Sequence, residues 1–269
     1  MMTDTASQAS DFALCLPGAC GRMGRMIRSV LTEEGISLSA ATEHENSPEV
    51  GQKAEGCTIT SDAADLGQGP GHVIVDFTGP EATRRHIEIA VSTNTPMVIG
   101  TTGLTQDDEK LITAASQQIP IVYCANTSVG VTLLAQLVRQ VARSLADDWD
   151  IEIIETHHNQ KVDAPSGTAL ALGQAAAEGR DVALSDVKDA VRDGYTGARK
   201  KGDIGFAVLR GGDVAGEHSV IFYGQQERIE LTHKAGGRVI FARGAVRAAG
   251  FASSAQPGLY SMDDVLSQG

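Results

Sequence analysis

The sequence predicts an α/β fold: a Rossmann-like doubly wound parallel sheet, followed by a smaller α+β domain with a mixed sheet. Three observations lead to this prediction. Short apolar runs alternate with helical patterns through the first half of the chain, a glycine-rich turn follows the first run, and several strand-like runs in the second half are joined by glycine-rich turns. Strands that alternate with helices indicate βαβ units and hence a parallel sheet.

The first half is expected to contain short strands separated by longer helices. The expected strands are residues 12–16, 36–42, 57–60, 73–77, 97–100 and 121–124. The expected helices are residues 21–33, 80–92 and 106–117. Pro80 suits the start of its helix, because the first helical position needs no backbone N–H donor.

The second half has a different pattern. The expected helices are residues 129–145, 166–177 and 238–250, and the expected strands are residues 151–156, 203–210, 217–223 and 228–232. Glycine-rich turns join the last three strands, which predicts antiparallel pairing among them. Residues 179–201 are polar and weakly patterned, which indicates a loop or lid, and residues 259–266 form a short amphipathic piece.

Composition limits the possible partners. The chain of 269 residues carries Lys+Arg 22 against Asp+Glu 34, a net charge of -12. Such a surface repels phosphate backbones, so nucleic acid and anionic membranes are not expected as partners. No apolar run approaches the roughly 20 residues of a membrane span, and the polar stretch from Met1 to Ser10 does not resemble a signal peptide. The four cysteines form no C-x-x-C pair, and a cytoplasmic location is expected.

A glycine-rich turn follows the first expected strand. It consists of Gly18, Ala19, Cys20, Gly21, Arg22, Met23 and Gly24. Glycines at this spacing permit a tight turn and a close approach to a pyrophosphate at the next helix N-terminus. The plainer alternative is a turn that only reverses the chain. Glu43, at the end of the second strand, stands where an acid hydrogen-bonds a ribose diol, so dinucleotide binding is the better interpretation.

The most specific stretch runs from Glu152 to Ala169 and reads EIIETHHNQKVDAPSGTA. Its candidate functional residues are His157, His158, Lys161, Gly167 and Thr168. Two histidines and a lysine so close together form a cationic, proton-exchanging patch in an acidic protein. The amides at the start of the following helix suit a carboxylate. The stretch therefore predicts a site for a small carboxylate that accepts a proton during reaction.

Other interpretations of this stretch were considered. Paired histidines in a loop are often ordinary surface or core residues. Glu155, His157 and His158 could converge on zinc, but adjacent residues of a strand point to opposite faces, and the H-E-x-x-H pattern is absent. Ser166 lacks the G-x-S-x-G elbow of a nucleophile and suits a helix cap. A non-catalytic dinucleotide sensor and another dehydrogenase of small carboxylates stay open at this point.

Over essentially its whole length the sequence resembles the 4-hydroxy-tetrahydrodipicolinate reductase family, long called dihydrodipicolinate reductases. The family run E-x-x-E-x-H-x-x-x-K-x-D-x-P-S-G-T-A is matched without a gap from Glu152 to Ala169. Its G-A-x-G-R-M-G loop is matched from Gly18 to Gly24, and its G-T-T-G turn from Gly100 to Gly103. The resemblance implies reduction of 4-hydroxy-tetrahydrodipicolinate to tetrahydrodipicolinate by NAD(P)H in diaminopimelate and lysine biosynthesis.

The resemblance also implies site residues and assembly. Lys161 would be the principal proton donor, and His157 a second proton donor or an orienting acid. The substrate-binding residues would be His158, Gly167, Thr168 and Arg238. The cofactor-binding residues would be Gly18, Ala19, Cys20, Gly21, Arg22, Met23, Glu43, Gly100, Thr101, Thr102, Cys124, Ala125, Asn126 and Thr127. No metal is implied. Residues 1–128 and 239–269 would form the dinucleotide-binding domain, and residues 129–238 a substrate-binding domain that joins its sheets in a homotetramer.

The residues beside the expected ribose site bear on the choice between NADH and NADPH. Proteins usually bind the additional phosphate of NADPH with an arginine. Here Glu43 repels that phosphate, and His44 and Glu45 supply one mostly neutral group and another acid. Arg22 and Arg25 lie in the loop and first helical turn, within possible reach. NADH is therefore expected to be used at least as well as NADPH.

Overall fold

The computed structural model describes residues 12–145 and 147–267, so the stretch from Met1 to Ser10 lies outside the described residues. The chain divides into two compact units, residues 1–129 with 239–269 and residues 130–238. No helix among the described residues is long and apolar enough to cross a membrane.

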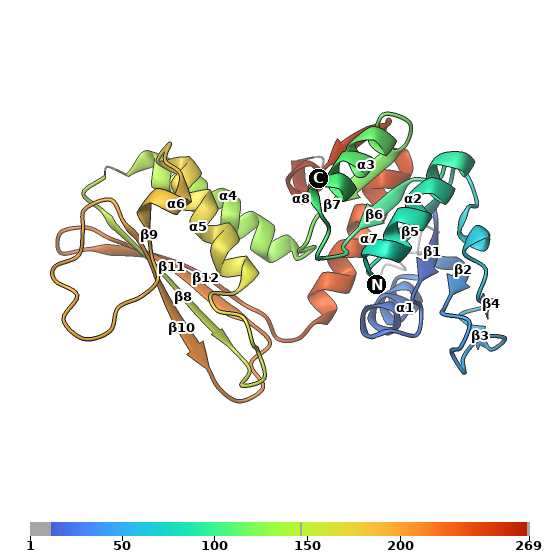
Figure 1. The fold of residues 1–269 in the computed structure, drawn as a ribbon, viewed down its shortest axis with the longest axis horizontal. Helices are drawn as coiled ribbons and strands as arrows, with labels where there is room; N and C mark the ends of the chain where they lie inside the picture. Colours follow the sequence, from blue (N-terminus) through green and yellow to red (C-terminus); the bar gives the residue numbers. More distant parts are fainter. Residues whose placement is uncertain (1–11, 146, 268–269) are drawn as a thin grey trace, which may run out of the picture. The chain divides into compact units, whose positions relative to one another are not determined.

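The first unit is built on a largely parallel sheet with the strand order β13-β7-β6-β5-β1-β2-β4-β3 (Figure 1). Its strands are β1 (Ala13–Pro17), β2 (Ser37–Thr42), β3 (Lys53–Ala54), β4 (Cys57–Thr60), β5 (His72–Asp76), β6 (Met97–Ile99), β7 (Pro120–Tyr123) and β13 (Gly258–Tyr260). Neighbouring strands pair in parallel except β3 with β4. The chain leaves β1 toward β2 and later continues on the other side at β5. This switch point is where ligands bind in open parallel sheets.

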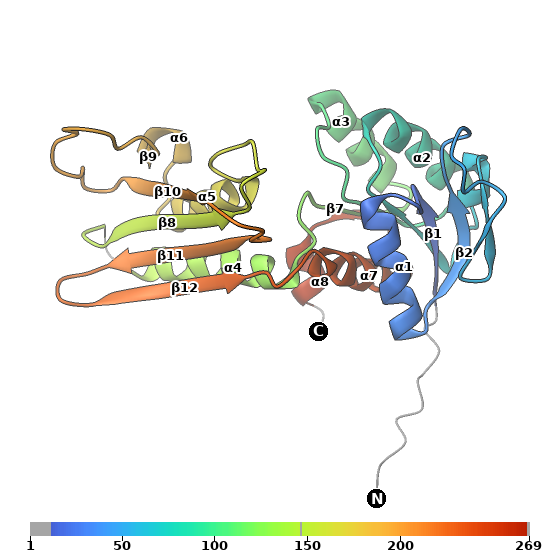
Figure 2. The ribbon, with the colours of Figure 1, turned by 90° about the horizontal axis from the view of Figure 1, so that it is seen from below.

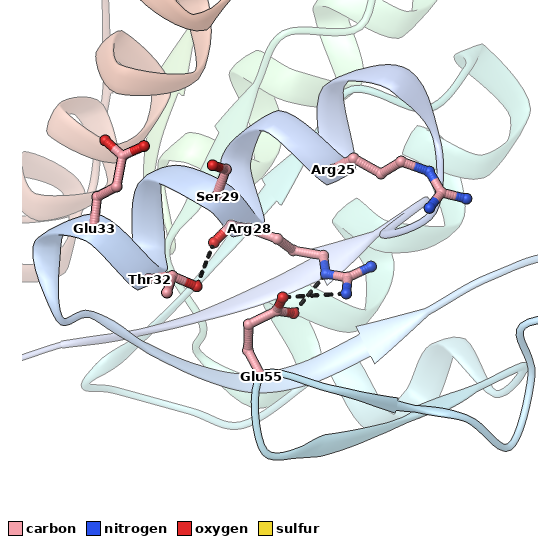
Figure 3. Close-up of a pocket in the computed structure, with 6 residues that line it drawn as sticks. All are labelled: Arg25, Arg28, Ser29, Thr32, Glu33 and Glu55. Carbon is pink, nitrogen blue, oxygen red and sulfur yellow. Dashed lines mark hydrogen bonds and ion pairs between the residues drawn. The ribbon is translucent and has the colours of Figure 1, made fainter.

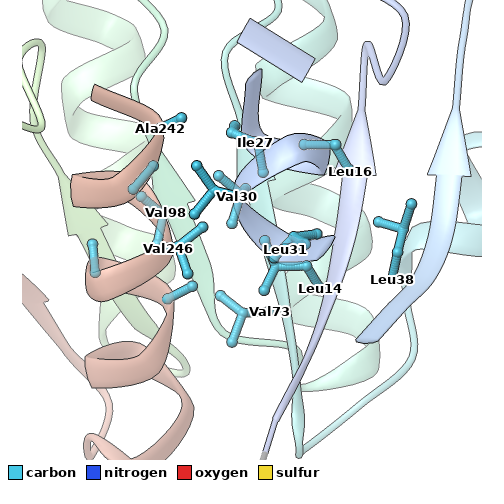
Figure 4. Packing of buried hydrophobic residues seen from close by; sticks show 14 of the residues in the cluster. Leu14, Leu16, Ile27, Val30, Leu31, Leu38, Val73, Val98, Ala242 and Val246 are labelled. Atoms are coloured by element: carbon cyan, nitrogen blue, oxygen red, sulfur yellow. The ribbon is translucent and has the colours of Figure 1, made fainter. Parts of the chain in front are cut away.

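Helices cover both faces of this sheet because successive strand residues point to opposite sides. The helices are α1 (Arg22–Glu34), the 3-10 helix η1 (Ala63–Leu66), α2 (Pro80–Thr93), α3 (Gln106–Ser116), α7 (Val239–Ser254) and α8 (Met262–Ser267). Leu14 of β1 lies in the cluster that α1 and α7 fill, whereas Cys15 lies in the cluster that α2 and α3 fill. In Figure 4, Val246 of α7 faces Val30 of α1. The doubly wound arrangement is confirmed.

The second unit has a mixed sheet with the order β12-β11-β8-β10-β9. Its elements are α4 (Val129–Ser144), β8 (Asp150–His157), α5 (Gly167–Gly179), α6 (Leu184–Val187), β9 (Lys188–Asp189), β10 (Ile204–Arg210), β11 (Glu217–Tyr223) and β12 (Arg228–Lys234). The helices α4 and α5 cover one face of this sheet (Figure 2). Alternate β8 residues such as Ile151 and Ile153 are buried in the core with Leu172 of α5.

The structure corrects three expectations. The antiparallel pairing holds for β11 with β12 but is wrong for β10, because β8 lies between β10 and β11 and pairs with β10 in parallel. The segment expected to be a loop or lid contains α6 and β9, and Arg192 and Arg199 bind Glu152 of β8 from it. The expected amphipathic piece near the C-terminus divides into the edge strand β13 and the helix α8.

Candidate active site

The glycine loop connects β1 directly to α1. Gly18 has φ +64, a left-handed conformation that a side chain disfavours. Gly21 is the N-cap of α1. A Cβ at Gly24 would lie 2.7 Å from the carbonyl carbon of Ala19 and would overlap the Gly18 carbonyl, so the helix packs tightly on the loop only with glycine there. A cavity of about 160 Å³ opens at this point. Its lining includes Gly18, Gly21, Arg22, Met23 and Phe77.

Glu43 lies against this loop. One carboxylate oxygen accepts a hydrogen bond from the backbone N–H of Cys20 at 3.0 Å, and the other accepts from the backbone N–H of His44 at 3.1 Å. Each oxygen keeps a further lone pair that can accept a ribose hydroxyl. The acid expected to bind the ribose therefore also fixes the loop that would hold the pyrophosphate, a second role that spacing alone did not indicate.

A polar network lies below the neighbouring strand ends. The hydroxyl and backbone N–H of Thr78 donate to Asp76 at 2.6 and 2.8 Å. Thr101 lies 3.4 Å from the same carboxylate and 2.8 Å from the hydroxyl of Thr83. A Cβ at Gly18 would lie 3.0 Å from the methyl group of Thr78, so the polar network packs closely against the glycine loop. The buried hydroxyl of Thr101 faces the network, whereas Thr102 is exposed.

The candidates after β6 and β7 fall into two groups. Gly100 is buried, Ala125 is exposed and Asn126 is half-buried, so backbone and short side chains form the carboxyl ends of these strands. The side chains of Cys124 and Thr127 are not suited to bind a cofactor by charge or by a free hydroxyl. Burial raises the pKa of the Cys124 thiol to about 12, so it stays uncharged at neutral pH. The buried Thr127 donates its hydroxyl to the carbonyl of Phe241 in α7 at 2.7 Å.

A hollow of about 430 Å³ lies along α1, beyond the glycine loop. Arg28 and Glu55 point toward one another across it, with Arg28 Nε 2.5 Å from Glu55 (Figure 3). Arg25 points away from this pair and donates to the carbonyl of Cys20 at 2.8 Å and to Glu49 at 3.0 Å. Both arginines beside the loop thus already have carboxylate partners, and Arg22 is exposed.

The histidine–lysine stretch begins at the carboxyl end of β8. His157 is the last residue of β8, and its Nδ1 lies 2.6 Å from Oε2 of the buried Glu155. Glu155 also accepts from the backbone N–H of Ser166 at 2.9 Å and from both terminal nitrogens of Arg210 at 2.7 and 2.9 Å. The ring of His218 meets that of His157 edge-on at 5.1 Å. Sequence reasoning had missed Arg210 and His218 as parts of this site.

The loop after His157 and the start of α5 complete this group. Lys161 donates from Nζ to Asp163 at 2.8 Å and is half-buried. Ser166 caps α5 by accepting from the backbone N–H of Ala169 at 3.1 Å, as capping predicts. Gly167 is exposed, and apart from its chain neighbours and the backbone of its own helix no atom of the described residues lies within 4 Å of where its Cβ would be, so a small anion could approach the first turn of α5.

The remaining predicted substrate contacts are placed as follows. His158 is half-buried and its backbone N–H donates to the carbonyl of Val214 at 2.8 Å. Arg238 is exposed directly before α7. Within residues 12–145 and 147–267, no group of three or more histidine, cysteine, aspartate or glutamate side chains could hold a metal ion. Glu155 accepts hydrogen bonds from both His157 and Arg210, so its carboxylate is already occupied, which argues against the zinc interpretation.

Comparison with known proteins resolves the family. Residues 13–127 match the family model "Dihydrodipicolinate reductase, N-terminus", and residues 130–266 match "Dihydrodipicolinate reductase, C-terminus". The chain belongs to the dihydrodipicolinate reductase family. It is 51% identical to the 4-hydroxy-tetrahydrodipicolinate reductase of Afipia carboxidovorans, over 97% of this chain and 98% of that one. It is 50% identical to that of Parvibaculum lavamentivorans, over 96% and 98%.

The fold agrees with this assignment. The structure resembles a dipicolinate-bound dihydrodipicolinate reductase from Paenisporosarcina sp. TG-14 with a TM-score of 0.71. The two sequences are 20% identical, and the match covers 93% of this chain and 97% of the other. The expected family, fold and class of enzyme are therefore confirmed: the chain is a pyridine-nucleotide-dependent oxidoreductase of the diaminopimelate route to lysine.

Proposed function

We propose that this dihydrodipicolinate reductase reduces 4-hydroxy-tetrahydrodipicolinate to tetrahydrodipicolinate with Lys161 and His157 as its proton-bearing groups. One observation supports the assignment: a single stretch of chain carries an ammonium group bonded to Asp163, an imidazole bonded to a buried carboxylate and the exposed first turn of α5. Such a combination suits a substrate that carries carboxylates and takes up a proton.

The side chains divide the work in this proposal. The hydroxyl on C4 of the substrate leaves as water, and a bound nicotinamide cofactor would supply the hydride that C4 then accepts. Lys161 supplies the proton that neutralises the negative charge developing on the ring, because its ammonium group sits on a flexible stem. His157 is a second proton donor or an orienting acid. The amides of Gly167 and Thr168 hold one substrate carboxylate, with His158 and Arg238 as further contacts.

The residues of the glycine loop fit a dinucleotide. Gly18 and Gly24 leave room that side chains would fill, and the N-terminus of α1 follows at once. The loop residues Gly18 to Met23 would hold the pyrophosphate, and Glu43 the adenosine ribose. The strand ends at Gly100–Thr102 and Cys124–Thr127 would line the nicotinamide side. Thr127 would do so mainly through its backbone, because its hydroxyl binds the carbonyl of Phe241 in α7.

We further propose that NADH is used at least as well as NADPH. Glu43 would repel an additional phosphate on the ribose it binds. The charges of Arg25 and Arg28 are already paired with Glu49 and Glu55, which weakens their attraction for that phosphate. These existing ion pairs support the expectation from the sequence.

The assembly proposed is a cytoplasmic homotetramer formed through the sheets of the second units. The helices α4 and α5 cover one face of that sheet, and strand residues on the sheet carry exposed apolar side chains. On the opposite face, Leu209 of β10 is 55% exposed and Tyr223 of β11 is 38% exposed. Exposed apolar side chains on an uncovered sheet face are typical of an interface between subunits. Sedimentation of the purified chain measures the number of subunits.

A direct assay tests the reaction. Authentic substrate is added to the purified chain with NADH or NADPH, and oxidation of the cofactor is followed by its absorbance. Cofactor oxidation that depends on the substrate is expected. Binding of nucleotide without any turnover would instead favour the dinucleotide sensor, and turnover with an amino-acid or keto-acid pair alone would favour another dehydrogenase.

A further inference from the structure

Arg210 connects two parts of the site that lie apart in the sequence. It is the last residue of β10, which pairs in parallel with β8 so that Arg210 lies opposite His157. Its terminal nitrogens donate to the two carboxylate oxygens of Glu155 at 2.7 and 2.9 Å, a bidentate pair. The nitrogen Nη2 also donates to the backbone carbonyl of Asp163 at 2.7 Å. One guanidinium therefore binds both β8 and the loop that carries Lys161.

The carboxylate of Glu155 is held ionised. It is 1% exposed, and burial alone would raise its pKa. The hydrogen bonds from Arg210, His157 and the backbone of Ser166 outweigh that cost and lower the pKa below its usual value. An ionised carboxylate only accepts hydrogen bonds, so Nδ1 of His157 must be the donor. The imidazole is thereby fixed with Nδ1 protonated and with Nε2 available for proton exchange.

The ring of His157 has a glycine at one edge and a histidine at another. A Cβ at Gly216 would lie 3.1 Å from Nε2, so the ring edge faces a glycine rather than a side chain. His218 packs edge-on against the ring, and burial, together with the nearby His157, lowers the pKa of His218 to about 4. His218 is bonded through Nε2 to the hydroxyl of Ser166 at 3.0 Å. A neutral neighbour of this kind fills space without competing for Glu155.

The other end of the connection concerns Lys161. Its Nζ donates to the Asp163 carboxylate at 2.8 Å, and the backbone carbonyl of the same Asp163 accepts from Arg210. Asp163 itself is exposed, so its side chain has little packing to fix it. The bond from Arg210 ties the backbone of Asp163, whose carboxylate binds the ammonium group, to the end of β10.

We propose that Arg210 is a positioning residue for both proton-bearing side chains, acting on His157 through Glu155 and on Lys161 through Asp163. This inference rests on the proposed function, because it takes those two side chains as the proton-bearing groups. Arg210 itself does not contact the reacting atoms in this proposal; it fixes the tautomer of one group and the location of the other.

The chain offers a matched control. Arg192 also binds a glutamate of β8 with two bonds, to Glu152 at 2.8 and 2.9 Å. Glu152 and Glu155 stand three residues apart on the strand and therefore point to opposite faces. Arg210→Met removes a bidentate ion pair behind His157, and Arg192→Met removes one away from it, where Arg199 still binds Glu152. Arg210→Lys keeps the charge but loses the bidentate geometry.

The experiment compares kcat, KM and the Kd for NADH, and records ¹⁵N imidazole spectra of histidine-labelled protein at alkaline pH. The His157 signal is assigned from its loss in His157→Gln. Arg210→Met is expected to lower kcat by roughly 10- to 100-fold, the range expected when proton transfer is impaired. The Kd for NADH should change less than about twofold, a negligible free energy. The His157 ring should shift from a single Nδ1–H tautomer to a mixture, with Arg210→Lys intermediate and Arg192→Met like wild type.

The outcomes separate this inference from the proposed function. Wild-type kcat and an unchanged tautomer in Arg210→Met would overturn it, as would an equal loss of kcat in Arg192→Met. If Arg210→Met does not fold, Arg210→Lys, which loses the bidentate geometry, still tests whether Arg210 fixes the His157 tautomer. A wild-type chain that lacks reductase activity refutes the proposed function alone, because the tautomer of His157 still shows whether Arg210 and Glu155 fix the ring.

Discussion

His86 of α2 donates from its ring to the carboxylate of Asp76 at the end of β5, with Nδ1 2.8 Å from Oδ2. Asp76 is fully buried and His86 is 5% exposed. The other oxygen of Asp76 binds Thr78 and Thr101, which stand beside the glycine loop and the next strand end. The pair therefore connects a core helix to the backbone expected to hold the dinucleotide.

The first prediction concerns the stability of this pair. Asp76→Asn should lower the free energy of unfolding at pH 7 by about 1–3 kcal/mol, because buried donors lose a charged partner. Burial alone would raise the pKa of Asp76, but His86 and Thr78 lower it below the usual value. The carboxylate therefore stabilises the fold above its unfolded pKa of about 3.9, and this contribution disappears as pH falls through the lowered value.

Urea unfolding at pH 7 and near pH 3 measures both parts of this prediction. The difference between wild type and Asp76→Asn should shrink at the lower pH. Asp107→Asn is the control, because that carboxylate is 88% exposed and pairs with Lys110 on the surface. An effect of equal size at both pH values would contradict the assignment of the charge to Asp76.

The second prediction concerns proton donation. Lys161→Met should reduce turnover by roughly 100-fold or more, the scale of a lost general acid. His157→Ala should also slow turnover substantially and leave nucleotide binding nearly intact, since the glycine loop is built from other residues. Steady-state rates and the Kd for NADH give the two quantities. Near-normal turnover in both variants would place the chemistry elsewhere.

The third prediction concerns the substrate carboxylates. Pyridine-2,6-dicarboxylate is flat and carries both carboxylates, so it should compete with the substrate. Thr168→Val should weaken its binding by about 1–3 kcal/mol, the cost of unmade hydrogen bonds to a charged group. Inhibition kinetics against each reactant check the assignment. Competition with the nicotinamide cofactor instead of the substrate would contradict it.

The fourth prediction concerns the cofactor. The ratio of kcat/KM for NADH and NADPH should be one or greater near pH 7, because Glu43 repels the additional phosphate of NADPH. His44→Arg should shift the preference toward NADPH. A wild-type preference for NADPH above about tenfold, or ~1.4 kcal/mol, would mean that a cation other than His44 binds the phosphate.

The fifth prediction concerns the glycine loop. Gly24→Ala places a Cβ against the backbone of Gly18 and Ala19 and should both destabilise the fold and weaken NADH binding. Gly79→Ala is the control, because no atom lies within 4 Å of its Cβ and its φ of -159 suits any residue. Thermal unfolding and NADH titration compare the two. Equal NADH affinities in both variants would show that the loop tolerates the methyl group.

The sequence was sufficient for most elements because hydrophobic periodicity determines which residues are buried. The helix 106–117 was expected from this pattern and is observed as Gln106–Ser116. Strand pairing was harder to predict. The turn at Arg210 suggested a hairpin, but β10 lies beside β8, whose core residue Ile153 pairs in register with Phe206. Local turn chemistry does not determine which of two apolar strands will be the neighbour.

The site was predictable where function resides in neighbouring residues and not where it depends on distant ones. His157 and Lys161 stand in one stretch, so their types and spacing were visible. Arg210 is 55 residues from Glu155 in the chain and reaches it through the parallel pairing of β10 with β8. No motif around Arg210 indicated an ion pair, because the contact arises from tertiary structure alone.

The division of the first unit between both ends of the chain affects how the protein is made. Its inner cluster includes Ala242, Ala245 and Val246 of α7, and β13 closes one edge of its sheet. On the ribosome, strands β1 to β7 emerge long before these pieces, with an apolar surface that α7 has yet to cover. The second unit is continuous in sequence and its whole core is synthesised before α7 appears. During translation, the unit whose synthesis begins first would thus be the last to finish folding.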